Sequence, residues 1–195
     1  NRIMFKRFSI CYILLMFCIT GTSAQEDQWT GNATNLSKGN LRVNSSGRYL
    51  EYSDGTPFLY MGDTAWELIS RLNDKETELY LENRREKGFT VIQTVILDEL
   101  DDMDVSSNGE PKLIDGNIDK PAPDYFTHVD KVISLAAAKG LYIALLPTWG
   151  DKVDKQWGKG PEIFTPENAY RYGKWLGERY MNASNLIWII GGDRS

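Results

Sequence analysis

Cysteine is nearly absent from this sequence of 195 residues, and both examples, Cys11 and Cys18, lie close to the N-terminus. They fall within residues 1–24, which have a positively charged start, a short apolar run and small residues before Ala24. This is the layout of a secretory signal peptide. The mature chain would then have no cysteine, which excludes disulfide bonds and thiol catalysis, although export would permit disulfides.

Two other interpretations of residues 1–24 stay open. The segment could remain uncleaved as a membrane anchor, but its apolar run is shorter than the ~20 residues that a spanning helix needs. Cys18 could carry a lipid, but Phe17 is bulky where lipid-attachment sites have a small residue. We expect export to the periplasm or the extracellular space, without stable membrane insertion after signal cleavage.

Histidine is also scarce, and acidic residues outnumber basic ones, 27 to 22. His128 is the single histidine, which excludes a metal site with several histidines and a Ser-His-Asp triad, so we expect it to be structural. The net charge of −5 becomes −8 once three positive residues, Arg2, Lys6 and Arg7, leave with the signal peptide. An acidic surface without basic runs argues against binding to nucleic acid. We expect no metal ion and no cofactor.

The sequence is rich, by contrast, in a repeated unit of a helix followed by a strand. After a first strand over 57–62, helices are predicted over 75–88, 123–140 and 166–182, and strands over 89–97, 141–147 and 185–190. Asn73 and Glu76 form a capping pair before the first helix, and Thr165 and Pro166 start the third. This alternation, with nearly continuous apolar strands, predicts an α/β fold with a parallel sheet covered by helices.

Two architectures fit that pattern, a doubly wound open sheet and a (β/α)₈ TIM barrel. An open sheet would be expected to carry a glycine-rich phosphate loop after its first strand, and "MGDTAW" is not one. A barrel typically needs ~250 residues, and this chain supplies about four strands. We therefore expect a truncated N-terminal half of a barrel preceded by short β-strands. The predicted divisions are a signal peptide (1–24), a linker (25–40) and an incomplete catalytic domain (41–195).

Polar and aromatic residues follow the predicted strands at their carboxyl ends, where parallel α/β folds place their sites. These residues are Asp63, Thr64 and Trp66; Gln93, Asp98 and Glu99; Trp149 and Asp151; and Asp193 and Arg194. Each has a plain structural alternative. Asp63 could cap the next helix, the acidic run over 98–104 could be a solvated surface, and the tryptophans could pack the loops.

Asp193 is the strongest candidate for chemistry. Gly191 and Gly192 precede it, so the backbone can turn sharply and a ligand can approach closely. An acid at a strand end, beside aromatic loops and without metal ligands or nucleotide loops, suggests carboxylate catalysis. Glycoside hydrolysis needs only two carboxyl groups, one of which serves as acid and then as base.

Five blocks of sequence, in this order, together resemble the apiosidase-like glycoside hydrolases: "MGDTAWELISRL", "YLENRREKGFTVIQTVIL", "HVDKVISLAAAKGLYIALLPTWGDK", "FTPENAYRYGKWLGERY" and "NLIWIIGGDR". The resemblance implies a retaining (β/α)₈ enzyme that acts on side chains of plant pectin. It implies that Asp193 is the general acid/base and that a glutamate nucleophile lies on a later strand, outside this chain. Asp63 and Trp66 would line the sugar pocket, with Gln93 and Trp149 beside them.

We accordingly expect glycosidase activity in a full-length parent and none in this chain alone. Two other functions stay open. One is a barrel glycosidase that cleaves within a polymer, which would have a groove in place of a pocket. The other is a non-catalytic carbohydrate-binding protein.

Overall fold

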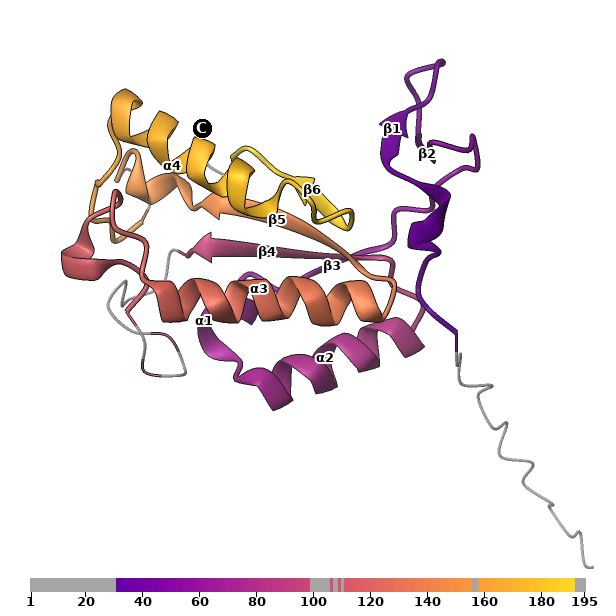
Figure 1. Ribbon diagram of the computed structural model, residues 1–195, viewed down its shortest axis with the longest axis horizontal. Helices are drawn as coiled ribbons and strands as arrows, with labels where there is room; N and C mark the ends of the chain where they lie inside the picture. The colour runs from indigo at the N-terminus through magenta and orange to yellow at the C-terminus, as the bar shows by residue number, and fades with distance from the viewer. Residues whose placement is uncertain (1–30, 99–105, 107–108, 110, 156–157, 192–195) are drawn as a thin grey trace, which may run out of the picture.

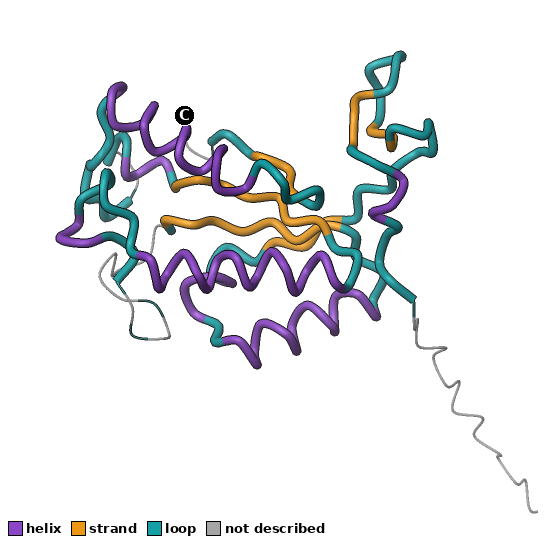
Figure 2. The backbone as a smooth tube through the Cα atoms, in the orientation of Figure 1, coloured by secondary structure: helices purple, strands orange, loops and turns teal. Residues whose placement is uncertain are grey.

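The computed structural model describes residues 31–98, 106, 109, 111–155 and 158–191, and its centre is a four-stranded parallel sheet (Figures 1 and 2). The strands lie in sequence order, β3-β4-β5-β6, which is the order of consecutive strands in a TIM barrel. Within the described residues the sheet is open and does not close on itself. The strands are β3 (Gly62–Thr64), β4 (Val91–Leu97), β5 (Tyr142–Thr148) and β6 (Leu186–Trp188).

Helices cover one face of this sheet. A short helix, α1 (Leu68–Arg71), leads into α2 (Asp74–Glu86), and α3 (Pro123–Ala138) and α4 (Pro166–Tyr180) follow. Figure 1 shows α2, α3 and α4 in the same order as the strands that they precede. The predicted alternation of helices and strands is confirmed for these units.

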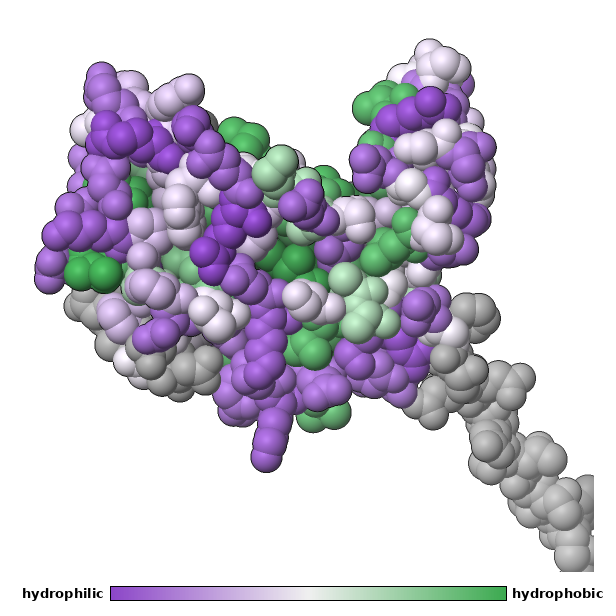
Figure 3. Space-filling view, in the orientation of Figure 1, coloured by the Kyte–Doolittle hydropathy of each residue, from purple (hydrophilic) through white to green (hydrophobic). Residues whose placement is uncertain are grey.

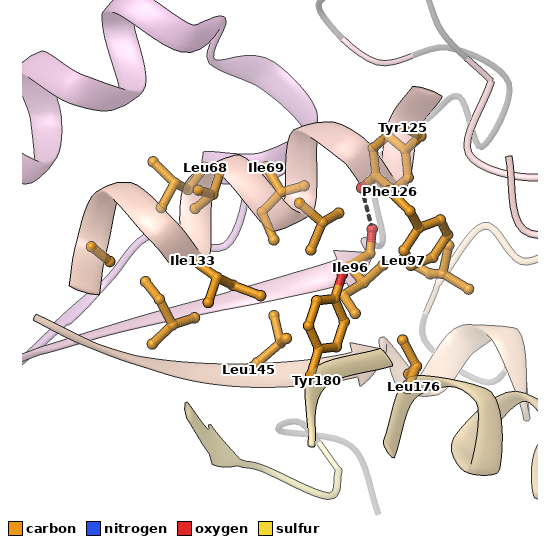
Figure 4. Close-up of a cluster of buried hydrophobic side chains, with 14 of the residues drawn as sticks. Leu68, Ile69, Ile96, Leu97, Tyr125, Phe126, Ile133, Leu145, Leu176 and Tyr180 are labelled. Atoms are coloured by element: carbon orange, nitrogen blue, oxygen red, sulfur yellow. Dashed lines mark hydrogen bonds between the residues drawn. The ribbon is translucent and has the colours of Figure 1, made fainter. Parts of the chain in front are cut away.

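A single apolar cluster joins the helices to the sheet. It includes Ile92 of β4, Leu145 of β5, Val132 of α3 and Leu176 of α4, all almost fully buried. Burial of each such side chain contributes roughly 1.5–3 kcal/mol. In Figure 4 the hydroxyl of Tyr125 donates a hydrogen bond to the carbonyl of Ile96 within this cluster, at 2.5 Å, so the one polar atom of that ring is satisfied.

The helix ends follow the signals in the sequence. Asn73 and Glu76 form a reciprocal capping box at the start of α2, and Thr165 with Pro166 starts α4. Asn168 completes the capping box at α4: its side-chain oxygen accepts a hydrogen bond from the backbone amide of Thr165 at 2.8 Å. After α3 the chain turns through Gly140, whose φ is +71°. A Cβ there would lie 2.5 Å from the carbonyl oxygen of Thr34, so only glycine fits.

The first parallel strand differs from its prediction. β3 covers Gly62–Thr64, and not residues 57–62. Phe58 is buried, but Leu59, Tyr60 and Met61 are exposed. In the described sheet β3 is an edge strand with β4 as its single neighbour, so an apolar run alone does not fix where its pairing begins.

The segment before the sheet falls within the predicted linker. Residues 31–40 contain a short 3₁₀ helix, η1 (Leu36–Lys38), and they lie against the end of α3. The amide of Ala33 donates to the carbonyl of Lys139 at 2.9 Å, and the hydroxyl of Thr34 donates to that of Gly140 at 2.6 Å. The first six residues of the predicted linker, 25–30, lie outside the described residues.

Beyond this segment, β1 (Leu41–Val43) and β2 (Leu50–Tyr52) form an antiparallel hairpin, which confirms the short strands predicted before the barrel. Figures 1 and 3 show this hairpin standing apart from β6, with a notch between them. Among the described residues, none of the helices combines the length and the apolar character needed to cross a membrane.

Candidate active site

Two tryptophans meet at the carboxyl end of the sheet. Trp66 follows β3 and Trp149 follows β5, and their ring centroids lie 5.1 Å apart with an angle of 63° between the rings. They pack with Val95 of β4 and Leu146 of β5, which belong to the face of the sheet opposite the helices. The structure therefore brings together two of the predicted site residues, on the face that would be the interior of a barrel.

The backbone holds both rings in place. The amide of Ala65 donates to the carbonyl of Gln93 at 2.8 Å, which extends the pairing of β3 and β4 up to the residue before Trp66. The amide of Trp149 donates to the carbonyl of Leu97 at 2.8 Å and extends the pairing of β4 and β5 in the same way. Trp66 therefore comes directly after the last paired residue of its strand, and Trp149 is itself the last paired residue of its strand.

Trp149 has an unused hydrogen-bond donor. Its side chain is only 4% exposed, and its indole nitrogen Nε1 is buried without a partner among the described residues. A buried indole N–H normally finds an acceptor, because leaving it unpaired costs free energy. The structure thus leaves this buried donor without an acceptor among the described residues.

Gln93 lies on the same face as the tryptophan pair. Its place in β4 alternates with Ile92 and Thr94, and it is paired in register with Thr64 and Ala144. Its side chain is half-buried, unlike the rest of β4, which is fully buried. An amide side chain at this position can donate to one group and accept from another.

Asp63 is not part of this group. Within β3 it is in register with Ile92, whose side chain is buried under the helices, so Asp63 faces the helices too. Its Oδ2 accepts hydrogen bonds from Tyr80 at 2.7 Å and from Arg84 at 2.9 Å, both on α2. Asp63 does not cap the next helix either, because α1 begins only at Leu68.

Two further rim acids, Asp98 and Asp151, are buried in ion pairs. Lys112 donates from Nζ to both carboxylate oxygens of Asp98 at 3.0 Å, and both residues are 3% exposed or less. Asp98 is therefore not part of a solvated acidic surface, which corrects that interpretation for this residue; the acids from 99 to 104 lie outside the described residues. The pair closes the long loop between β4 and α3.

The second pair lies in the loop between β5 and α4. Oδ2 of Asp151 accepts from Nζ of Lys152 at 2.8 Å and from the amide of Gly160 at 2.9 Å. Both residues of the pair are 1% exposed. A Cβ at Gly158 would lie 2.1 Å from the Cβ of Asp151, so this close packing requires a glycine. Sequence reasoning missed the two lysines, because nothing local marks a lysine that will be buried.

The other singled-out residues have structural positions or are not described. Nδ1 of His128 lies 3.1 Å from a carboxylate oxygen of Asp74, which links α3 to α2. Trp175 packs edge-on against Phe126 in the core. Glu99, Asp193 and Arg194 lie outside the described residues. Across the part of the chain that the structure describes, no group of three or more His, Cys, Asp or Glu side chains could hold a metal ion.

A cavity of about 490 Å³ lies at the opposite end of the sheet. It is lined by the hairpin at Leu41 and Val43, by the start of β5 at Tyr142, and by β6 at Ile187 (Figure 3). Parallel α/β proteins carry their sites at the carboxyl ends of the strands, and this cavity is at the amino ends. It is therefore not the candidate active site.

Comparison with protein-family models identifies the family of the chain. A family model described as "Apiosidase-like, catalytic domain" matches residues 44–195, which is well over half of the chain. The chain belongs to the apiosidase-like family. A search of curated proteins gives no match.

Solved structures similar to this apiosidase-like chain are glycoside hydrolases. One, described as "Glycoside hydrolase", is 39% identical with a TM-score of 0.70, and the match covers 80% of this chain and 35% of that one. A glycoside hydrolase family 5 protein from Bacteroides vulgatus is 32% identical, also with a TM-score of 0.70, over 80% of this chain and 33% of that one. The chain thus spans about a third of the length of these two structures.

More distant structures share the fold alone. An endo-1,4-beta-mannanase from Rhizomucor miehei has a TM-score of 0.53 at 15% identity, over 80% of this chain and 49% of that one. Together these matches confirm the predicted fold class: the described sheet and helices are part of a TIM-barrel fold. They also support a glycoside hydrolase in general.

Proposed function

We propose that this chain is part of an exported, retaining glycoside hydrolase that acts on side chains of plant pectin or on similar glycans. The observation that carries the proposal is the pair formed by Trp66 and Trp149 on the helix-free face, at the carboxyl end of the sheet. Flat aromatic rings suit the CH-rich faces of sugars. Membership of the apiosidase-like family supports glycosidase chemistry at this end of the fold.

Within this proposal the tryptophans and Gln93 bind the sugar. One ring of the pair packs against a sugar face, and Nε1 of Trp149 donates to a hydroxyl or a ring oxygen. The amide of Gln93 contacts a second hydroxyl. Because these groups orient the substrate without changing charge, they act mainly on binding and on alignment with the catalytic carboxyls.

Asp193 has the catalytic role. It follows β6 in the sequence, the next strand after the one that carries Trp149. As general acid it protonates the leaving oxygen, and as general base it then activates water. A second carboxyl, expected on a later strand of the full-length protein, attacks the anomeric carbon from ~5–5.5 Å away, as in retaining glycosidases. The negative charge of that second carboxyl would favour the protonated form of Asp193 before the first step.

The test is the release of sugar from pectic oligosaccharides by the full-length protein and by its Asp193→Asn variant. We expect the variant to lose ~10²-fold or more in kcat, because an amide cannot transfer the proton. Equal rates for both proteins would contradict the role of Asp193. An Asp119→Asn variant is the matched control, since that aspartate forms an exposed ion pair with Arg171 and should keep full activity.

A non-catalytic carbohydrate-binding protein is the main alternative, because an aromatic pair serves binding equally well. In that case neither protein would release sugar from a broad panel of glycans, yet both would bind one of them. An enzyme that cleaves within a polymer would instead release oligosaccharides of mixed length, and the products of the same assay distinguish it.

A further inference from the structure

Asp63 and Trp66 lie near the same end of β3, but their side chains are on opposite faces of the sheet. Asp63 is in register with Ile92, which is buried under the helices, and so it faces α2. Trp66, three residues later, packs with Val95 and Trp149 on the helix-free face. A carboxylate among the helices does not reach a ligand on the other side of the sheet.

The contacts of Asp63 tie the strand to α2. Its Oδ2 accepts from the hydroxyl of Tyr80 at 2.7 Å and from Nη1 of Arg84 at 2.9 Å, and its Oδ1 accepts from the amide of Thr64 at 2.9 Å. The guanidinium of Arg84 also lies over the rings of Tyr80 and Phe89, at 5.1 and 5.4 Å from their centroids. Two aromatic rings thus fix the guanidinium of Arg84 in the position from which it donates to Asp63.

These bonds are stronger than an exposed ion pair. The side chains of Asp63 and Arg84 are each 26% exposed, so water competes for them only in part. Burial, together with the hydrogen bond to Asp63, raises the pKa of Tyr80 well above its ordinary value. The hydroxyl consequently stays protonated, and remains a donor to Asp63, over the whole physiological pH range.

The strand that carries Asp63 is short, and its backbone hydrogen bonds run to β4 and the residue before it. β3 has three residues and is paired, within the described sheet, with β4 alone. Its position relative to the helices therefore depends on side chains, and Asp63 supplies two bonds to α2. We propose that Asp63 is a positioning residue, which acts through Tyr80 and Arg84 to hold Trp66 against Trp149; its part in catalysis rests on the function proposed above.

The optical coupling of the two indoles tests this without any assay of activity. Two tryptophans 5.1 Å apart give an exciton couplet in the far-ultraviolet circular dichroism spectrum, and Trp66→Phe in the full-length protein identifies it. We expect Asp63→Asn to reduce the couplet by half or more. Arg84→Gln and Tyr80→Phe should reduce it too. In the double variant with Asp63→Asn, Arg84→Gln should add little, because both act through one contact.

Asp130→Asn is the matched control. Asp130 also receives two bonds from an arginine, Arg179, and also joins two elements, α3 and α4, but it lies far along the chain from Trp66. This variant should keep the couplet. If it does, a weaker couplet in the Asp63 variants cannot be attributed to a general loss of stability. In the sugar assay the Asp63→Asn variant should raise KM severalfold with a smaller change in kcat.

Three outcomes decide the matter. A weaker couplet in the Asp63 and Arg84 variants, without additivity, supports the positioning role even if no sugar is ever cleaved. An unchanged couplet in Asp63→Asn overturns it. An unchanged couplet together with a lower activity, independent of Arg84, would show that Asp63 contacts the substrate directly.

Discussion

Asp98 and Asp151 show how a single residue can look catalytic in a sequence and be structural in the fold. Both follow strands at the end where barrel enzymes act, and both are buried against a lysine, at Nζ-to-oxygen distances of 3.0 and 2.8 Å. Their partners are Lys112, fourteen positions from Asp98, and Lys152, next to Asp151. Such pairs depend on how a loop closes, and a sequence does not show that.

Lys112→Met should be strongly destabilising, because it leaves the carboxylate of Asp98 buried without a partner. We expect a loss of about 3–5 kcal/mol in the free energy of unfolding. Urea denaturation of the full-length protein measures it. The double variant Asp98→Asn with Lys112→Met should lose less than the single one, since no charge is then buried alone.

Lys120→Met is the control for this prediction. Lys120 pairs with Asp115 at 3.5 Å, but both side chains are more than half exposed, so the change should cost no more than about 0.5 kcal/mol. Equal stability losses at Lys112 and Lys120 would contradict the account of the buried pair.

At the scale of elements, the starts of helices could be predicted from local sequence signals, whereas the register of the strands could not. The capping boxes at Asn73 and Thr165 set the starts of α2 and α4 as expected, because a cap satisfies amides within its own turn. The face of Asp63 was not predictable in the same way. A shift of one residue in β3 would turn that side chain to the opposite face, and only pairing with β4 sets the shift.

Contacts between helices make one pH dependence predictable. Glu82 of α2 accepts from Arg85 on its own helix, and from Lys139 after α3 at 2.8 Å. Hydrogen bonds from Arg85 and then Lys139 lower the pKa of Glu82 to about 2. Because the folded pKa is depressed, this carboxylate stabilises the fold above its unfolded pKa, near 4.5, and the contribution is lost as the pH falls toward 2.

The measurement is the free energy of unfolding of the wild type and of Glu82→Gln at pH 7 and pH 3. The difference between the two proteins should be largest at pH 7 and should shrink at pH 3. The size is modest because the Glu82 side chain is 36% exposed. A difference that grows on acidification would contradict the assignment. Glu178→Gln, which affects an exposed pair with Lys174, is the matched control.

At the scale of the whole molecule, the described sheet has two unlike faces. One is covered by α2, α3 and α4, and the other carries Val95, Leu146 and the tryptophan pair. The fold class followed from the alternation of helices and strands, since only a parallel sheet accommodates it. From the sequence, Trp66 and Trp149 could be placed only at the carboxyl ends of their strands, and both their shared face and their contact needed the structure.

The central claim is that sugar binds at the tryptophan pair. It is tested most directly by titrating the full-length protein, as wild type and as Trp66→Ala, with a pectic oligosaccharide that the wild type binds, in a calorimeter. Trp188→Phe is the control, because Trp188 is in register with Leu145 on the helix-covered face. We expect at least about tenfold weaker binding for Trp66→Ala, since a central tryptophan contact is typically worth more than 1 kcal/mol, and no change for Trp188→Phe. Equal affinity for Trp66→Ala and the wild type would contradict it.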